Sequence, residues 1–297
     1  MSATETARSL VHRIGEAQGL DRLAKPVAAK VGELVGHGTR KDVLSGTWLG
    51  HPLHPMLTDL PIGFWTSSFM LDLLGGKAGR KASKRLLGLG ILAAVPTAAA
   101  GLSDWSDTIE GDRRIGAAHA VGNVAALGLY SLSWRARRRG SHGRGVALGF
   151  LGAGAASVGG YLGAHLVYRK GVGADHNAFK EESTDWVDVG SLADLDPGAR
   201  RVVKVADDDV LLVRRGLGDV SAILELCAIS NVCGHAGGPL DEGEFDAEGC
   251  VTCPWHGSVF RLDSGHVVHG PATGHQPAYD VQVQDGRISL RRRRSMS

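Results

Sequence analysis

Two short segments in the last quarter of the chain hold the residue types with the clearest chemistry. The first contains Cys233 and His235. The second begins after seventeen intervening residues and contains Cys253 and His256. Two thiolates and two imidazoles are the donors of a 2Fe–2S centre in which one iron binds two cysteines and the other binds two histidines. A structural zinc site uses the same residue types, but zinc fingers usually keep the two cysteines together and the two histidines together. Because each segment supplies one residue of each kind, the pattern favours the iron–sulfur cluster.

The residues around these donors extend the pattern. The run Cys233-Gly-His-Ala-Gly-Gly-Pro-Leu240, followed by Cys253-Pro-Trp-His-Gly-Ser-Val-Phe260, resembles the Rieske ferredoxin family, and the resemblance covers about residues 186–290. It implies a small all-β sandwich that binds a 2Fe–2S cluster at the tips of two loops, through the two cysteines and two histidines above. A third loop, 270–272, resembles the proline loop that covers the cluster in this family. Beside the cluster the resemblance places Gly238, Trp255, Ser258 and Pro271.

Two departures concern cysteines. Gly238 and Trp255 stand where respiratory members carry the cysteines of a disulfide, whereas Cys227 and Cys250 are additional cysteines at other positions. The additional pair could join across adjacent strands, but single buried thiols are favoured.

A further departure concerns hydrogen bonds to the cluster. Ser258 matches the serine that often donates to a bridging sulfur, but Phe260 stands where high-potential members carry tyrosine. With one polar donor of the two, we expect a reduction potential in the middle of the Rieske range of roughly −150 to +300 mV.

The chain between residues 55 and 168 contains four long apolar segments, although a mean hydropathy of −0.03 and 43% hydrophobic residues resemble an ordinary soluble protein. About 20 apolar residues span a bilayer. The segments lack amphipathic stripes and are separated by short charged loops, so we expect them to cross the membrane rather than form a soluble bundle. Small residues recur every four positions along the last segment, as in helices that pack closely in lipid. These features predict an all-α four-helix transmembrane bundle with spans at 55–76, 86–103, 115–134 and 145–168.

Two basic segments predict the orientation of this bundle. Residues 77–85 and residues 135–144 are expected to be loops, and each contains five basic residues and no acidic one. The positive-inside rule places both loops in the cytoplasm. The N-terminal tail and the Rieske domain then lie on the extracytoplasmic side of a bacterial cell membrane.

Alternating helix direction brings several polar residues to that same face of the bundle. Ionisable residues near a membrane are costly, and their default interpretation is functional. A single histidine would be expected to hydrogen-bond a neighbouring helix, but four at one level indicate a cofactor. Paired imidazoles from facing helices hold b-type haem in bundles, and a quinone pocket or a metal ion would use the same residues. The expected haem or quinone site consists of His51, His54, Asp104, His119, Asn123 and His165.

These polar residues occur in recurring motifs. His51-Pro-Leu-His-Pro55, Gly101-Leu-Ser-Asp-Trp105 and Gly160-Tyr-Leu-Gly-Ala-His165, with His119 and Asn123, resemble a family of bacterial four-span membrane proteins defined by the H-P-L-H-P motif. The resemblance covers about residues 46–173. The function of that family is poorly defined, so the resemblance supports the architecture and the choice of polar residues rather than a reaction.

The expected organisation therefore joins an all-α membrane part to an all-β part. Residues 1–45 form an amphipathic segment whose apolar positions recur at helical spacing. The bundle occupies 46–170, a linker 171–183, the Rieske domain 184–290, and a basic tail 291–297. Within the Rieske domain, β-branched content and turn spacing predict strands at 201–205, 210–214, 222–228, 251–253, 267–268 and 279–284.

These features predict a membrane-anchored electron-transfer protein without a substrate site of its own. Electrons would pass one at a time between a membrane redox group, either b-type haem or a quinone from the quinone pool, and a redox protein partner. Two alternatives are a redox-sensing membrane module and an anchored ferredoxin for a separate oxygenase. The 41 residues after His256 leave no room for the 2-His-1-carboxylate domain that an oxygenase would need. The closing arginine run favours a solvated or lipid-facing end, so no nucleic-acid partner is expected.

Overall fold

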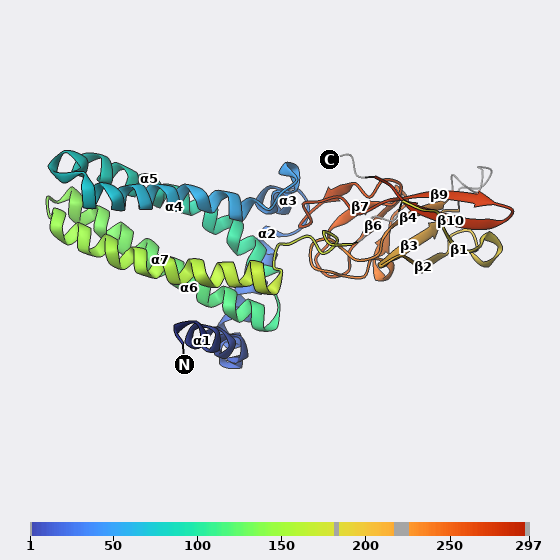
Figure 1. Cartoon of the computed structure of the whole chain (residues 1–297), viewed down its shortest axis with the longest axis horizontal. Helices are drawn as coiled ribbons and strands as arrows, with labels where there is room; N and C mark the ends of the chain where they lie inside the picture. The colour runs from blue at the N-terminus through green and yellow to red at the C-terminus, as the bar shows by residue number, and fades with distance from the viewer. Residues whose placement is uncertain (1, 181–183, 217–225, 295–297) are drawn as a thin grey trace. The chain divides into compact units, whose positions relative to one another are not determined.

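A computed structural model describes residues 2–180, 184–216 and 226–294. The chain forms two compact units. One unit consists of Met1–Gly36 and Pro52–Val172, and the other of His37–His51 and Gly173–Ser297. The first unit is helical and the second holds the β-strands (Figure 1). The polypeptide therefore passes three times from one unit to the other.

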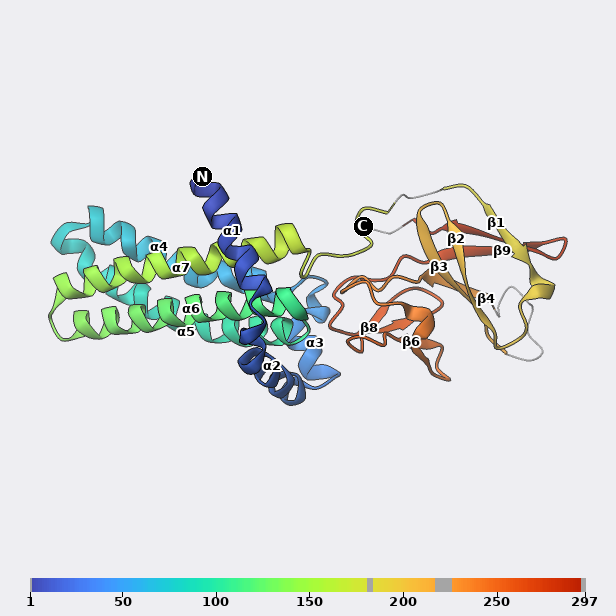
Figure 2. The ribbon, with the colours of Figure 1, turned by 90° about the horizontal axis from the view of Figure 1, so that it is seen from below.

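Four long helices dominate the helical unit and run side by side (Figure 2). They are α4 (Leu53–Leu74), α5 (Gly76–Ser106), α6 (Glu110–Arg138) and α7 (His142–Lys170). At most three residues connect each of these helices to the next, and the closest packing joins α4 to α5 and α6 to α7 as two antiparallel hairpins.

Among the described residues, three helices are long and apolar enough to cross a membrane, namely α5, α6 and α7. The fourth expected span is α4, which contains Asp59 and Asp72 and falls short by composition. The basic segments were expected as loops, and that expectation was wrong for most of their length. Residues 77–85 are the first turns of α5, and α6 continues to Arg138. Lysine, arginine and alanine are good helix formers, so nothing ends the helices where the apolar residues end.

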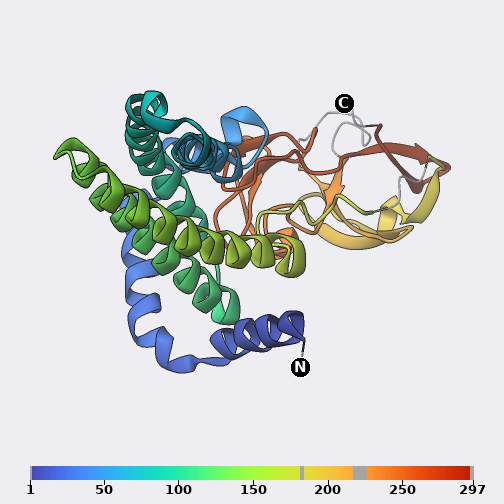
Figure 3. The ribbon, with the colours of Figure 1, turned by 60° about the vertical axis from the view of Figure 1, so that its left-hand side comes forward.

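The N-terminal segment forms two helices rather than one continuous helix. Helix α1 (Ala3–Glu16) starts in a capping box between Ser2 and Glu5, and α2 (Asp21–Val35) follows after the 3₁₀ turn η1 (Gln18–Leu20). Val11 of α1 lies in a buried cluster with residues of α6 and α7, including Ile115 and Leu162 (Figure 3, dark blue helix). The buried apolar positions of α1 are therefore explained by its packing on α6 and α7.

Small residues let α6 and α7 approach each other closely. A Cβ at Gly159 would lie 2.7 Å from the Asn123 side chain, and one at Gly152 would lie 3.1 Å from the Tyr130 ring. Gly160 is exposed and has nothing near it. The helix contact thus uses Gly152 and Gly159, whereas Gly160 faces outward.

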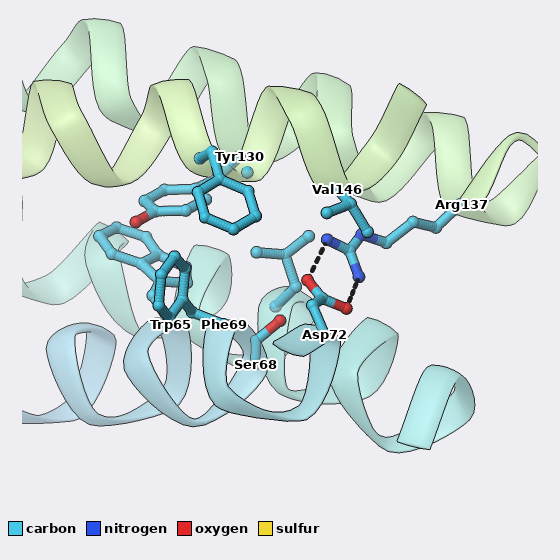
Figure 4. Close-up of a pocket in the computed structure, with 10 residues that line it drawn as sticks. Trp65, Ser68, Phe69, Asp72, Tyr130, Arg137 and Val146 are labelled. Carbon is cyan, nitrogen blue, oxygen red and sulfur yellow. Dashed lines mark hydrogen bonds and ion pairs between the residues drawn. The ribbon is translucent and has the colours of Figure 1, made fainter. Parts of the chain in front are cut away.

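A buried ion pair joins the two hairpins near their connecting turns (Figure 4). Arg137 of α6 makes two 2.6 Å hydrogen bonds to the two carboxylate oxygens of Asp72 on α4. The hydroxyl of Ser83 on α5 donates to Asp72 (2.7 Å) and accepts from Arg137 (2.7 Å). A small cavity of about 10 Å³ lies beside the pair and is lined by aromatic rings, including Trp65 and Tyr130. This volume has room for about one water molecule.

The β unit contains three antiparallel sheets, ordered β1-β10-β9, β2-β3-β4 and β5-β6-β7-β8. Strand β3 is buried on both faces because Leu211 and Val213 face one core while Val210 and Leu212 face the other. The strands are β1 (Val187–Ser191), β2 (Arg200–Val205), β3 (Asp208–Arg214), β4 (Leu226–Ser230), β5 (Glu244–Phe245), β6 (Cys250–Thr252), β7 (Val259–Arg261), β8 (Val267–His269), β9 (Tyr279–Gln284) and β10 (Arg287–Arg292).

The predicted strands correspond to β2, β3, β4, β6, β8 and β9. Residues 222–225 of the strand expected at 222–228 lie outside the described residues. Strand β10 includes Arg291 and Arg292, so the expected tail starts inside the sheet. Arg291 contacts Asp280 of β9 (3.1 Å), which fixes it beside the neighbouring strand.

Two segments outside the strands complete the β unit. Residues 37–51 contribute helix α3 (Thr39–Ser45) and the 3₁₀ turn η2 (Thr47–Leu49). Residues 173–180, expected to be linker, are hydrogen-bonded to loops of the β unit. Asn177 is buried and donates to the carbonyl of Val232 (2.9 Å) and to the side chain of Gln276 (2.8 Å).

Candidate metal centre

Two loops with the same backbone geometry carry the four predicted donors. The first donor loop, residues 233–238, follows β4, and the second donor loop, residues 253–258, joins β6 to β7. In the first loop the N–H of Cys233 donates to the carbonyl of Gly238, and the N–H of Gly237 donates to the carbonyl of Cys233. Cys253 makes the equivalent bonds with Ser258 and Gly257 in the second loop. Gly237 and Gly257 both have positive φ (83° and 74°), which favours glycine.

The two loops bring the thiols together and the imidazoles together. Cys233 and Cys253 are 1% and 3% exposed, and their side chains form a hydrogen bond. The rings of His235 and His256 have centroids 5.1 Å apart and planes at 84°. The donors therefore form a sulfur pair and a nitrogen pair, although each pair combines residues from different loops.

The electrostatics of the donors suit metal binding. Burial lowers the pKa of His235 to about 3, with a smaller contribution from the neighbouring His256, so its imidazole is neutral. Only the neutral ring has a nitrogen lone pair for a metal ion. Backbone N–H groups of His235 and Ala236 point at the sulfur of Cys233. Hydrogen bonds of this kind tune the potential of an iron–sulfur cluster.

The donor set fits a two-iron cluster better than one metal ion. A tetrahedral zinc site would need all four donors around one centre. A 2Fe–2S cluster with two protein ligands on each iron needs the paired arrangement that the two loops provide.

Three of the four residues expected beside the cluster lie in the donor loops, and the fourth, Pro271, lies in the loop 270–272. A Cβ at Gly238 would lie 2.9 Å from the sulfur of Cys253 and 3.1 Å from the ring of Trp255, so only glycine fits there. Trp255 is 54% exposed. Ser258 is fully buried and accepts a hydrogen bond from the N–H of Ala272 (2.9 Å), beside Pro271. Cys227 and Cys250 are both buried free thiols.

Several residues at the donor loops carried no sequence signal. A Cβ at Gly234 would lie 2.8 Å from the carboxylate of Asp175, and the N–H of Gly234 donates to Gln276 (3.3 Å). A Cβ at Gly237 would lie 3.3 Å from the ring of His176. Asp175 and His176 come from the segment that had been expected to be a linker. Their distance along the sequence from the donors hid the contact.

The helical unit brings together part of the expected haem or quinone site. The rings of His54 on α4 and His119 on α6 have centroids 6.4 Å apart and planes at 89°. Asn123 lies one turn beyond His119, and its Nδ2 atom is 3.1 Å from Nε2 of His119. Asp104 lies near the end of α5, and His165 on α7 is close to the charges of Asp112, Arg169 and Lys170. His51 belongs to the β unit.

The two hairpins hold their histidines in the same way. Nδ1 of His54 lies 2.9 Å from the carbonyl oxygen of Thr97 on α5, and the ring lies against Gly101, four residues later. Nδ1 of His119 lies 2.7 Å from the carbonyl oxygen of Gly159 on α7, and the ring lies against Gly163, again four residues later. A Nδ1–H donor to a backbone carbonyl fixes the tautomer that leaves Nε2 as the metal-binding or accepting nitrogen.

Two families match consecutive parts of the chain. Residues 50–176 match a family described as Predicted membrane protein (DUF2231), and residues 185–280 match the Rieske [2Fe-2S] domain. The chain is 29% identical over 104 residues to ferredoxin CarAc of Metapseudomonas resinovorans. It is 30% identical over 102 residues to the 3-phenylpropionate/cinnamic acid dioxygenase ferredoxin subunit of Photorhabdus laumondii. Each match covers 90% of the relative and 35% or 34% of this chain.

Other similar proteins are much longer than the matched region. The chain spans 15% of apoptosis-inducing factor 3 of Mus musculus, at 30% identity over 100 residues. It spans 25% of the carnitine monooxygenase oxygenase subunit of Escherichia coli, at 32% identity over 100 residues. Among solved structures, the ferredoxin of carbazole 1,9a-dioxygenase from Nocardioides aromaticivorans IC177 is 34% identical, with a TM-score of 0.32. That alignment covers 36% of this chain and 98% of the ferredoxin.

The donor set and the family match together define an iron–sulfur protein of the Rieske class. The chain belongs to the Rieske [2Fe-2S] family through its C-terminal part, and it carries a membrane domain of the DUF2231 family in the same polypeptide. Its cofactor is a 2Fe–2S cluster. Homology to the ferredoxin components of oxygenases supports electron transfer as its chemistry.

Proposed function

We propose that Cys233 and Cys253 bind one iron of the cluster and that His235 and His256 bind the other. The observation that carries this assignment is the matched geometry of the two donor loops, each of which presents one buried thiol and one imidazole. Bound in this way, the cluster would supply reversible one-electron chemistry.

The remaining residues of the centre would hold the cluster and keep it dry. Phe260 and Leu240 are fully buried in the core under the donor loops, in the same cluster of side chains as Cys233 and Cys253. Ser258 accepts its hydrogen bond from Ala272, which leaves its own hydrogen to donate toward a cluster sulfur. These features support a potential in the middle of the Rieske range.

The helical unit would anchor this centre in the membrane as four spans. The composition of α5, α6 and α7 supports three of them. The paired charge of Asp72 supports the fourth, because a carboxylate that is hydrogen-bonded to Arg137 costs much less in a membrane than an isolated one. Basic residues at the start of α5 and the end of α6 favour a cytoplasmic location for that end of the bundle, and hence an extracytoplasmic Rieske domain.

The membrane redox group would bind between His54 and His119. The two rings have centroids 6.4 Å apart, and each Nδ1 lies at a backbone carbonyl oxygen, which leaves each Nε2 to bind a ligand. His54 and His119 would thus hold the iron of a b-type haem, which would supply one-electron chemistry, and the same nitrogens could hydrogen-bond a quinone. Asn123 also donates to the carbonyl of His119 (3.0 Å), so its amide keeps a partner when Nε2 binds a ligand.

In this proposal the protein passes single electrons between the membrane redox group and a protein partner. A second candidate function is that of an anchored ferredoxin that delivers electrons to a separate oxygenase. The similarity to two oxygenase ferredoxins over nearly their whole length favours this candidate. Reduced protein that transfers electrons to a purified oxygenase component, but is not reduced by quinols, would favour the ferredoxin role.

Spectra of the full chain purified in mild detergent test the proposal. A rhombic EPR signal with an average g value below that of the free electron is expected on reduction, and His256→Ala should abolish it. A Soret band with a reduced α peak is expected from the membrane group, and His54→Ala or His119→Ala should remove it without changing the EPR signal. Wild-type protein without the rhombic signal would refute the cluster assignment. Protein made with ample haem but lacking a Soret band would refute the haem, and quinol reduction would then decide for or against a quinone.

A further inference from the structure

The segment just before the first long helix packs on the cluster centre. Residues 37–51 belong to the β unit, although more than 120 residues separate them from the rest of it. They precede the Rieske match, which begins at residue 185, and nearly all of them precede the DUF2231 match, which begins at residue 50. Neither family therefore accounts for what this segment does.

The segment holds both ends of the cover loop, residues 270–272. Asp42 of α3 accepts a hydrogen bond from the N–H of Gly270 (2.7 Å), and its second oxygen lies 2.9 Å from Nδ1 of His269. The hydroxyl of Thr47 donates to the carbonyl of Ala272 (3.0 Å). A Cβ at Gly270 would collide with this hydroxyl, so the approach of the two segments requires glycine there.

The cover loop in turn holds the second donor loop. Ala272, whose carbonyl accepts from Thr47, donates its N–H to the hydroxyl of Ser258. Ser258 lies two residues after His256 and is fully buried. The direction of the Ser258 hydroxyl thus depends on Ala272, and the position of Ala272 depends on Thr47.

The same segment also lies directly against the second donor loop. A Cβ at Gly257 would lie 2.6 Å from Nδ1 of His37. The positive charge of Lys41 acts on His235 in the first donor loop. Residues 37–47 therefore contact the second donor loop and the cover loop, and they place a positive charge near the first donor loop.

We propose that residues 37–51 form a fixed cap on the cluster centre, and that Asp42 and Thr47 are positioning residues that set its reduction potential through the cover loop and Ser258. This inference rests on the proposed cluster ligands. Loss of either contact would free the cover loop and let the Ser258 hydroxyl turn away from the cluster. A lost hydrogen bond to a cluster sulfur disfavours the reduced form, so the potential would become more negative.

Paired substitutions in the full chain separate positioning from charge. Asp42→Asn and Asp42→Ala both remove the negative charge, but only asparagine keeps an oxygen that can accept from Gly270. Thr47→Ser keeps the donor to Ala272, and Thr47→Val removes it with little change in volume. Asp188 provides the matched control, because it also accepts from a glycine N–H (Gly190, 3.0 Å) and pairs with a basic side chain, but lies on β1.

EPR-monitored redox titration is the measurement. We expect Asp42→Ala to have a more negative midpoint than Asp42→Asn, and Thr47→Val a more negative midpoint than Thr47→Ser, each with shifted g values. The Asp188→Ala and Asp188→Asn variants should have equal midpoint potentials and equal g values. Equal midpoint potentials and g values in Thr47→Val and Thr47→Ser would overturn the proposed role of residues 37–51. If Asp42→Ala fails to assemble a cluster, the two Thr47 variants alone decide the test. A wild-type chain without a cluster signal would instead refute the proposed function.

Discussion

The ion pair between Asp72 and Arg137 provides a quantitative test of how the helical unit is held together. Both side chains are almost completely buried, at 6% and 2% exposure, and two hydrogen bonds join them. Asp72→Asn leaves the guanidinium buried without its counter-charge, and Arg137→Met does the same to the carboxylate. Removing one partner of a buried pair costs about 3 to 5 kcal/mol.

Replacing both partners should lower the free energy of unfolding by far less than the sum of the two single substitutions. Asp72→Asn with Arg137→Met leaves no buried charge. The Ser83 hydroxyl keeps an acceptor in the amide oxygen at position 72 and lies 3.0 Å from the hydroxyl of Ser68. Ser68 and Ser133 also keep acceptors, because they donate to the carbonyls of Ser83 and Gly145. We therefore expect the free energy of unfolding of the double variant to lie within about 1 to 2 kcal/mol of the wild-type value, since no charge is left buried without its partner.

Unfolding of the purified full chain by SDS titration, followed by far-ultraviolet circular dichroism, would measure these free energies. The cluster EPR signal of the same samples controls for the β unit, which the substitutions do not touch. Additive effects of the two single substitutions would refute the reasoning, because independent sites add and a coupled pair does not.

Three further predictions concern the β unit. Ser258→Ala should lower the cluster midpoint potential by about 60 mV, the equivalent of one hydrogen bond of about 1.4 kcal/mol; an unchanged midpoint would contradict the proposed contact with the cluster. Burial raises the pKa of Cys227 and of Cys250. An alkylating reagent should therefore modify neither thiol of the native protein at about pH 8, near the usual thiol pKa, and a disulfide-linked peptide in mass spectra would overturn this expectation. Burial and the 2.7 Å hydrogen bond to Asp208 raise the pKa of Tyr279. Since this pKa lies above the unfolded value of about 10, the stabilisation is fully present below about pH 10 and is lost as the pH rises through the folded pKa. In absorbance titrations, wild-type protein should have one more phenol than Tyr279→Phe that ionises only as the protein unfolds.

The donor pattern could be predicted from the sequence because it depends on local backbone geometry. The spacings C-x-H and C-x-x-H differ, yet each loop places glycine four residues after its cysteine, at Gly237 and Gly257. That glycine allows the positive φ on which both loops turn. The apolar segments were predictable for a similar reason, since length and composition alone decide whether a helix can cross a bilayer.

The start of α5 follows helix propensity rather than hydropathy, whereas the partner of Asp72 depends on a contact between distant helices. The basic stretch 77–85 continues α5 because charged residues with high helix propensity do not end a helix. The charge of Asp72 weakened the prediction of the first span, and only the packing of α4 against α6 shows that Arg137 neutralises it.

The sequence by itself determined the cluster type and the joining of a membrane part to a Rieske domain, and it predicts the four donors. These properties follow from residue types at short, fixed spacings. The tertiary structure decided which distant residues surround the donors: Asp42 and Thr47 hold the cover loop, and Asp175 lies against the first donor loop. Each of these contacts is a single hydrogen bond or the approach of one side chain to a backbone group. Any polar residue that the fold brings close can make such a contact, so residue spacing in the sequence does not predict which residue makes it.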